Sequence, residues 1–283
     1  LDPKFAPAWA GVAHAHWVRA SRGMAPPAEA TAEARASALR ALELDPGSGE
    51  AHALLGVLDA HSRNIQAGIA SLNRAIELEP GLVDAYVWLG RFQYCLGRHA
   101  EAQASMLKAV SLDPLSMIHH TSVGDAYYYA RDYERSVVYY RRAIELDPRF
   151  DGAHTDLARS LEALGRFDES RAEYEEGRRL AGGVAGPSFG LAHLEASMGN
   201  VAESRRILDE LIAARAQRVV SAWGIAALSA SLGDVDEAFR WLDVAVEEGA
   251  TGLTFLLVHP RLDAIRSDPR YHQVLERVGF DST

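Results

Sequence analysis

A Leu-Asp-Pro or Leu-Glu-Pro tripeptide returns in this chain at a constant interval. It occurs at 44–46, 78–80, 112–114 and 146–148, so successive prolines are evenly spaced. The period is about 34 residues, which is typical of stacked helix–turn–helix units that each pack only on their neighbours. The interval therefore predicts an all-α helical-repeat architecture rather than a globular enzyme.

The repeat frame extends over most of the chain if each unit ends two residues after its proline. It then predicts seven units at 6–48, 49–82, 83–116, 117–150, 151–184, 185–218 and 219–252, together spanning residues 1–252, the first with a longer loop and helix. In six of the first helices a small residue follows an apolar one, namely Gly56, Gly90, Gly124, Ala158, Ala192 and Ala226. A small side chain there lets the second helix of the unit approach closely, and a larger one would overpack the contact.

Glycines and a final helix signal mark the ends of helices. Gly97, Gly165, Gly199 and Gly233 recur in frame between the two helices of their units, and glycine tolerates the left-handed conformation that ends a helix. Residues 253–283 are expected to form a capping segment, because a repeat array needs a terminal helix with a polar outer face. The chain opens on Leu-Asp-Pro, like the end of a unit, which predicts a fragment of a longer protein.

Composition excludes several classes of function. The net charge is −10, and an acidic surface repels phosphate backbones, so this segment is not expected to bind nucleic acid. A single cysteine, Cys95, allows neither an internal disulfide nor a thiolate metal cluster. There is no apolar run of about 18 residues, so no membrane span is expected.

The motifs of enzymes and metal sites are weak. Residues 186–190, Gly-Pro-Ser-Phe-Gly, match the Gly-x-Ser-x-Gly of serine hydrolases, but that motif needs a strand-to-helix elbow, whereas Ser188 falls at the start of an expected helix. Paired histidines such as His119 and His120 do not face each other on a helix. We therefore expect no catalytic residues, no cofactor and no metal.

The spacing and residue types together resemble the tetratricopeptide repeat (TPR) family over nearly the whole chain. Its aromatic positions are matched by Trp9, Tyr133 and Phe167, and its terminal proline by the series that starts at Pro46. The resemblance implies a right-handed superhelical α-solenoid that ends in a capping helix. Later units depart from the pattern, with Gly182 in place of the proline and Gly177 and Leu211 in place of a small alanine, which predicts looser or differently angled joints.

The resemblance also implies a concave groove lined by the first helices, and in it the binding of a protein or peptide partner. The inward-projecting positions of the central units carry Trp88, Arg91, Tyr94, Thr121, Asp125, Tyr128, Tyr129, Thr155, Arg159 and Glu162. Aromatic residues and arginine are enriched where binding energy concentrates. The alternative interpretation is that Trp88 and the tyrosines only pack between neighbouring units.

Residues 257–269, Leu-Val-His-Pro-Arg-Leu-Asp-Ala-Ile-Arg-Ser-Asp-Pro, resemble the tail that closes TPR regions of bacterial multidomain signalling proteins. In those proteins the upstream part is an adenylate or guanylate cyclase, a Ser/Thr kinase or a winged-helix regulator. The resemblance implies a cytoplasmic, non-catalytic scaffold that serves as the regulatory part of a signalling protein. The alternative hypothesis is a self-association module, a homodimer that brings upstream effector domains together.

Overall fold

The computed structural model describes residues 3–21, 24–62, 64–182, 185–215 and 220–280, and within them all side chains but those of 27 and 185–188. This part of the chain folds into fifteen α-helices and two short 3-10 helices and contains no strand. The all-α helical-repeat class expected from the sequence is confirmed. Among these residues, no helix is both long enough and apolar enough to cross a membrane.

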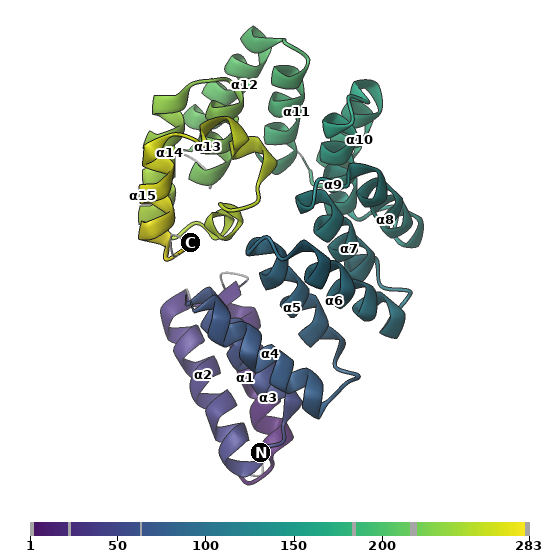
Figure 1. Ribbon diagram of the computed structural model, residues 1–283, viewed down its shortest axis with the longest axis vertical. Helices are drawn as coiled ribbons and strands as arrows, with labels where there is room; N and C mark the ends of the chain where they lie inside the picture. The colour runs from purple at the N-terminus through teal and green to yellow at the C-terminus, as the bar shows by residue number, and fades with distance from the viewer. Residues whose placement is uncertain (1–2, 22–23, 63, 183–184, 216–219, 281–283) are drawn as a thin grey trace. The chain divides into compact units, whose positions relative to one another are not determined.

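The α-helices follow the repeat frame (Figure 1). The first fourteen are α1 Ala6–Ser21, α2 Pro27–Leu44, α3 Gly49–His61, α4 Ile65–Leu78, α5 Val83–Cys95, α6 His99–Leu112, α7 Met117–Tyr129, α8 Tyr133–Leu146, α9 Asp151–Ala163, α10 Phe167–Leu180, α11 Ala185–Ser197, α12 Val201–Ala214, α13 Ala222–Ser231 and α14 Val235–Glu247. Then come η1 Thr251–Phe255, η2 Pro260–Ile265 and α15 Pro269–Val278. The helices α3, α5, α7, α9 and α11 begin at equal intervals, which match the spacing of the prolines.

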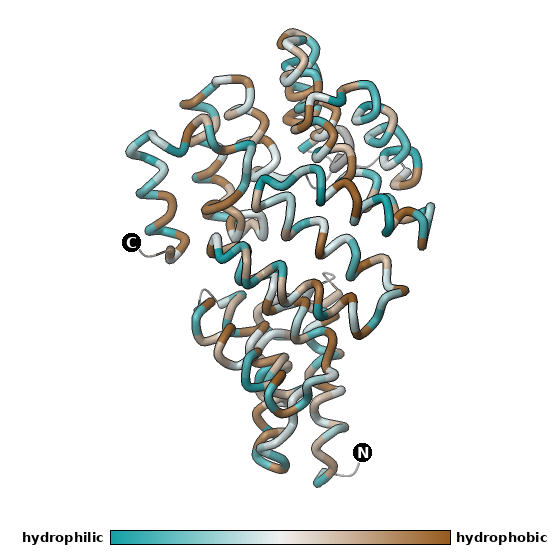
Figure 2. The backbone as a smooth tube through the Cα atoms, turned by 45° about the vertical axis from the view of Figure 1, so that its right-hand side comes forward, coloured by the Kyte–Doolittle hydropathy of each residue, from teal (hydrophilic) through white to brown (hydrophobic). Residues whose placement is uncertain are grey.

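The helices gather in two compact units. The first unit comprises residues 1–93 and 100–114, and the second comprises 94–99 and 115–283. Helices α1–α4 and most of α5 and α6 belong to the first unit, whereas α7–α15, the last two residues of α5 and the first residue of α6 belong to the second. Hydrophobic and hydrophilic positions alternate along the helices (Figure 2), as expected for helices that are buried on one face.

The recurring tripeptide ends helices for a steric reason. Asp45 and Asp147 directly follow α2 and α8 and have φ of −142° in both cases. The next residue is proline, which disfavours helical geometry in the residue before it. At the other end, Ser48 and Ser116 cap α3 and α7, because each side chain accepts a hydrogen bond from the backbone N–H three residues on. The tripeptide and the serine thus punctuate successive repeats.

Left-handed residues close the first helix of several repeats. Gly97, Gly165, Gly199 and Gly233 have φ of 74°, 73°, 83° and 77°. The place between Gly97 and Gly165 in the frame is taken by Arg131, which adopts the same conformation with φ of 65°. A residue with a Cβ atom incurs a steric cost in the left-handed conformation that glycine does not incur. The repeat, rather than the residue type, therefore imposes this backbone geometry.

Small residues allow the helices of one repeat to touch. A Cβ atom at Gly124 in α7 would lie 2.4 Å from Cε1 of Tyr140 in α8, closer than carbon atoms can approach. Gly177 in α10, which departs from the family pattern, faces Thr155 in α9, because a Cβ there would lie 2.8 Å from the Thr155 Oγ1. This glycine therefore accommodates the threonine hydroxyl.

We expect Gly124→Ala to lower the free energy of unfolding by about 2 kcal/mol, because the added methyl group overpacks the contact with Tyr140. Urea denaturation followed by circular dichroism measures the loss. The matched control is Gly11→Ala in α1, where a Cβ would meet nothing within 4 Å and no loss is expected. Equal stability of the two variants would contradict the packing argument.

Candidate partner-binding surfaces

An aromatic cluster lies on the first helices of the first unit. The ring of Trp17 in α1 meets the ring of His61 in α3 edge-on, with centroids 4.7 Å apart. His61 lies 5.6 Å from Trp88 in α5, which stacks on Phe92 at 5.8 Å. Packing of the His61 ring lowers its pKa, and the positive charge of Arg91 lowers it further. The histidine therefore stays neutral at pH 7 and acts as one more aromatic surface.

A pocket of about 340 Å³ opens beside this cluster, and we call it the first-unit pocket. Residues of α1, α3 and α5 line it, among them Trp17, Trp88, Glu50 and Asp84. The two carboxylates are exposed, whereas the tryptophans are half-buried. Arg91 lies over the Trp88 ring, with its guanidinium carbon 5.6 Å from the centroid. The pocket thus combines an indole-rich wall with acidic residues.

In the second unit the expected groove positions contact the C-terminal part of the chain. Residues 251–266, which we call the tail segment, include Phe255, whose ring stacks on Tyr129 at 5.2 Å and on Tyr94 at 6.2 Å. Both tyrosines are buried, with exposed fractions of 2% for Tyr94 and 5% for Tyr129. The tail segment also contacts α13 through η2 and lies beside it in Figure 1.

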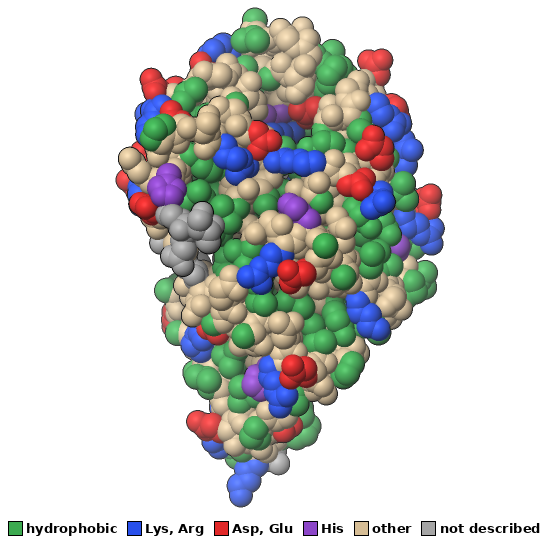
Figure 3. Space-filling model, in the orientation of Figure 1, with side chains coloured by type: hydrophobic (Ala, Val, Ile, Leu, Met, Phe, Trp, Pro, Cys, Tyr) green, Lys and Arg blue, Asp and Glu red, His purple; other side chains and the backbone are tan. Residues whose placement is uncertain are grey.

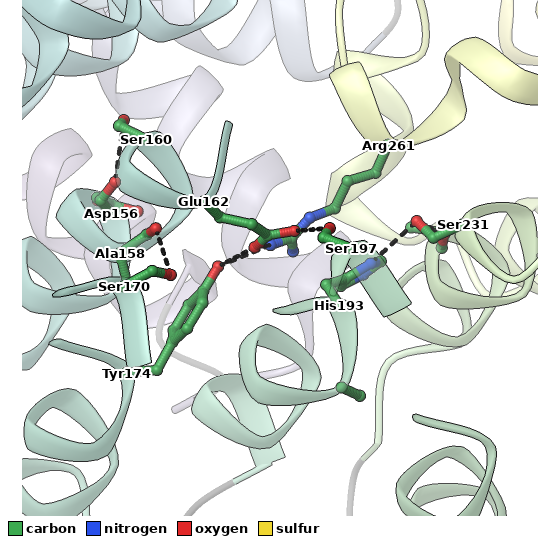
Figure 4. Close-up of polar contacts among 12 residues, drawn as sticks. Asp156, Ala158, Ser160, Glu162, Ser170, Tyr174, His193, Ser197, Ser231 and Arg261 are labelled. Carbon is green, nitrogen blue, oxygen red and sulfur yellow. Dashed lines mark hydrogen bonds and ion pairs between the residues drawn. The ribbon is translucent and has the colours of Figure 1, made fainter. Parts of the chain in front are cut away.

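Arg261 of the tail segment is held by α9 and α10. Its guanidinium donates to a Glu162 carboxylate oxygen at 3.1 Å and to the Tyr174 hydroxyl oxygen at 2.8 Å. The Tyr174 hydroxyl donates to the same Glu162 oxygen at 2.9 Å, and Ser197 donates to the other oxygen at 2.8 Å (Figure 4). The exposed fractions of the Arg261 and Glu162 side chains are only 19% and 10%. The ion pair is largely buried, and both carboxylate oxygens of Glu162 accept hydrogen bonds.

A second arginine forms a similar arrangement one repeat earlier. Arg159 in α9 donates to a carboxylate oxygen of Asp125 and, at 3.0 Å, to the hydroxyl oxygen of Tyr140. Tyr140 in turn donates to Asp125 at 2.8 Å, and the guanidinium lies 4.3 Å from the ring centroid of Tyr128. Burial raises the pKa of nearby Asp156 to about 7, even though Arg159 opposes the shift. Charged side chains of both signs and histidines gather in the hollow of this unit (Figure 3).

Two buried histidines, His193 and His259, lie close enough to Arg261 for its charge to affect them. His259 of the tail segment packs edge-on against Trp223 at 5.6 Å and Tyr129 at 6.0 Å, and its Nδ1 accepts from the backbone N–H of Arg261. His193 in α11 shares a 3.0 Å hydrogen bond with the Ser231 hydroxyl. Burial lowers the pKa of both imidazoles well below the ordinary value, and the charge of Arg261 adds to the effect. Both rings are neutral at pH 7.

The ten residues expected to bind a partner thus fall into three groups. Trp88 belongs to the wall of the first-unit pocket, with Arg91 beside it. Thr121 and Thr155 donate to carbonyl oxygens of their own helices, α7 and α9. The remaining six lie in the second unit, in or beside the contacts with the tail segment or the Arg159 arrangement, namely Tyr94, Asp125, Tyr128, Tyr129, Arg159 and Glu162.

Sequence reasoning missed Phe255, His259 and Arg261, which were assigned only to a cap. The frame gives only a weak signal, since the residue one full repeat after Arg159 is His193 and supplies no guanidinium. Residues 186–190 lie in the first two turns of α11 rather than at a strand-to-helix elbow, and the Ser188 side chain lies outside the described residues. Within the described part of the chain, no group of three or more His, Cys, Asp or Glu could hold a metal ion.

Comparisons with known proteins identify the repeat. Family models described as tetratricopeptide repeat match residues 83–114, 124–185 and 189–252. A tetratricopeptide repeat protein from Parabacteroides merdae ATCC 43184 is similar over 96% of this chain and 99% of its own, with 13% identity and a TM-score of 0.64. No curated protein sequence matches this chain.

Two further solved structures are similar. One is PilW, a widely conserved type IV pilus biogenesis factor, which matches 73% of this chain and 95% of its own at 19% identity, with a TM-score of 0.62. The other is pilF from Pseudomonas aeruginosa, with 88% and 95% covered, 17% identity and a TM-score of 0.56. At such identities the likeness shows the fold alone.

Proposed function

This chain belongs to the tetratricopeptide repeat family, and on that premise we propose that it is a non-catalytic scaffold whose first-unit pocket binds a segment of a protein partner. Proteins of this family bind protein partners. The observation that carries the proposal is the wall of Trp17 on α1 and Trp88 on α5, whose ring centroids lie 6.3 Å apart. Tryptophan in a well-packed pocket is the residue type that contributes most to binding energy.

The charges around the pocket define the partner. Glu50 and Asp84 are exposed carboxylates in its lining, and the whole chain carries a net charge of −10. Complementary charge speeds association and selects among partners. The occupant we propose is therefore a peptide segment with one large apolar side chain flanked by lysine or arginine.

We expect Trp88→Ala combined with Trp17→Ala to weaken binding of such peptides by about 2 kcal/mol or more, which is about 30-fold in Kd, because both indoles of the pocket wall are removed. The peptides are selected from a random display library against the wild-type chain, and their affinities are measured by calorimetric titration. The control is Val138→Ala, an exposed apolar residue of α8 outside the pocket. Selected peptides that lack basic residues, or that bind the double variant as well as the wild type, would disprove the proposal.

We further propose that the scaffold is the regulatory part of a bacterial signalling protein and acts in the cytoplasm. The support is the likeness of residues 257–269 to the tails of such proteins. The competing hypothesis is self-association that dimerises upstream effector domains. Light scattering over a concentration series separates the two, because a mass that stays at 30.8 kDa contradicts self-association.

A further inference from the structure

The tail segment supplies a guanidinium to the second unit in a repeat that has no arginine of its own at the position equivalent to Arg159. In the repeat at 117–150, Asp125 and Tyr140 accept hydrogen bonds from the guanidinium of Arg159, which belongs to the next repeat. In the repeat at 151–184, Tyr174 occupies the position equivalent to Tyr140. The position equivalent to Arg159, however, carries His193 in the repeat after it. Arg261 supplies the missing guanidinium to Tyr174, paired there with Glu162.

The tail segment reaches several repeats at once. Phe255 stacks on Tyr129 at the end of α7 and on Tyr94 at the end of α5. Asp263 pairs with Arg131 after α7 at 3.0 Å. With Arg261 on α9 and α10, and η2 on α13, the segment makes an aromatic, a cationic and an anionic contact with the first-helix side of the unit.

The tail segment is also shaped to make these contacts. The Arg266 guanidinium donates to the carbonyl oxygens of Leu256, Leu257 and His259 at 2.8, 2.8 and 3.0 Å, which fixes the backbone between η1 and η2. Gly252 lies so close to Trp223 that a Cβ would come within 2.4 Å of the ring. Pre-shaped segments lose less conformational entropy on binding than disordered ones do.

We propose that the tail segment is an internal ligand, which occupies the groove of the second unit and closes it to partner segments. The proposal rests on the proposed function, because it takes the first-helix side of a TPR unit as a binding surface. The occupant is the chain's own residues 251–266. A partner that opens this groove carries the same chemistry, namely an aromatic residue followed six positions later by an arginine, like Phe255 and Arg261.

The test is binding in trans of a fluorescein-labelled peptide with the sequence of residues 251–266, followed by anisotropy. The full chain is used as wild type and as Phe255→Ala with Arg261→Ala, which loosens the internal ligand. The peptide is expected to bind the variant saturably and the wild type at least about tenfold more weakly, because a tethered competitor acts at an effective concentration in the millimolar range. A peptide with alanine at both positions should bind neither protein.

Two results overturn the proposal: equal affinity for both proteins, or no binding to a variant that keeps the helical circular dichroism spectrum. If the double variant loses that spectrum, Phe255→Ala with Arg261→Lys decides by the same criteria, since lysine keeps a counter-charge for the buried Glu162 but loses the guanidinium hydrogen bonds. A Trp88→Ala control separates this inference from the proposed function. That residue lies in the first unit, so its loss should not change binding of the 251–266 peptide.

Discussion

Arg261→Ala is expected to lower the free energy of unfolding of the second unit by about 3–5 kcal/mol, the range measured when one partner of a buried ion pair is removed. The reason is the fate of Glu162. Its carboxylate is only 10% exposed and would keep its hydrogen bonds to Tyr174 and Ser197 but lose its counter-charge. Urea denaturation followed by circular dichroism measures the loss.

The matched control is Arg142→Ala on α8. Its partner Glu145 lies one turn away at 2.8 Å, and both side chains are about half exposed, at 48% and 64%. Such surface pairs contribute about 0–1 kcal/mol. Arg261→Ala combined with Glu162→Gln should recover part of the loss, because the buried charge is then removed. A loss no greater than that of Arg142→Ala would show that the tail segment is not held by this ion pair.

The sequence specifies the repeats well because their signals are local. The pre-proline aspartates Asp45 and Asp147 end helices through a clash between adjacent residues, and an even spacing of prolines is visible without any tertiary knowledge. The first-helix positions follow from the same period, which is why Trp88 and Tyr129 could be chosen as surface candidates. These inferences need only contacts within a repeat or between neighbours.

The contacts that those first-helix positions make with the tail segment could not be predicted in the same way. Glu162 and Arg261 are 99 residues apart, and no period relates a repeat position to a residue beyond the last repeat. The sequence shows that Arg159 is followed by His193 in the frame, but not where the replacement guanidinium comes from. Periodicity predicts which residues line a surface, whereas the non-local fold determines what covers them.

Acidification is expected to destabilise the second unit through His193 and His259. Both have folded-state pKa values well below the ordinary value because they are buried, and Arg261 lowers both further, so they stay neutral. In the unfolded chain they bind protons below about pH 6.5, so stability is lost as the pH falls. Between pH 7.5 and 5.5 each contributes a loss of about 1–2 kcal/mol, roughly 3 kcal/mol together.

Asp156 acts in the opposite direction and must be removed to expose this effect. Its folded-state pKa is raised to about 7 by burial, so below that pH the folded state binds a proton that the unfolded chain does not bind, and stability rises. Asp156→Asn should therefore show the full loss of roughly 3 kcal/mol on acidification to pH 5.5, more than the wild type shows.

His259→Asn in the Asp156→Asn background should reduce that loss by about 1–2 kcal/mol, the share of this one imidazole. Asparagine can still accept the Arg261 N–H at the start of η2 but does not titrate, whereas the charges that lower the pKa of His259, those of Arg131, Arg159, Arg261 and Arg266, remain. Urea denaturation at pH 7.5, 6.5 and 5.5 measures each difference. Identical pH profiles with and without His259 would mean that this imidazole is hydrated in the folded state, and therefore that the tail segment is not seated against Tyr129 and Trp223 in solution.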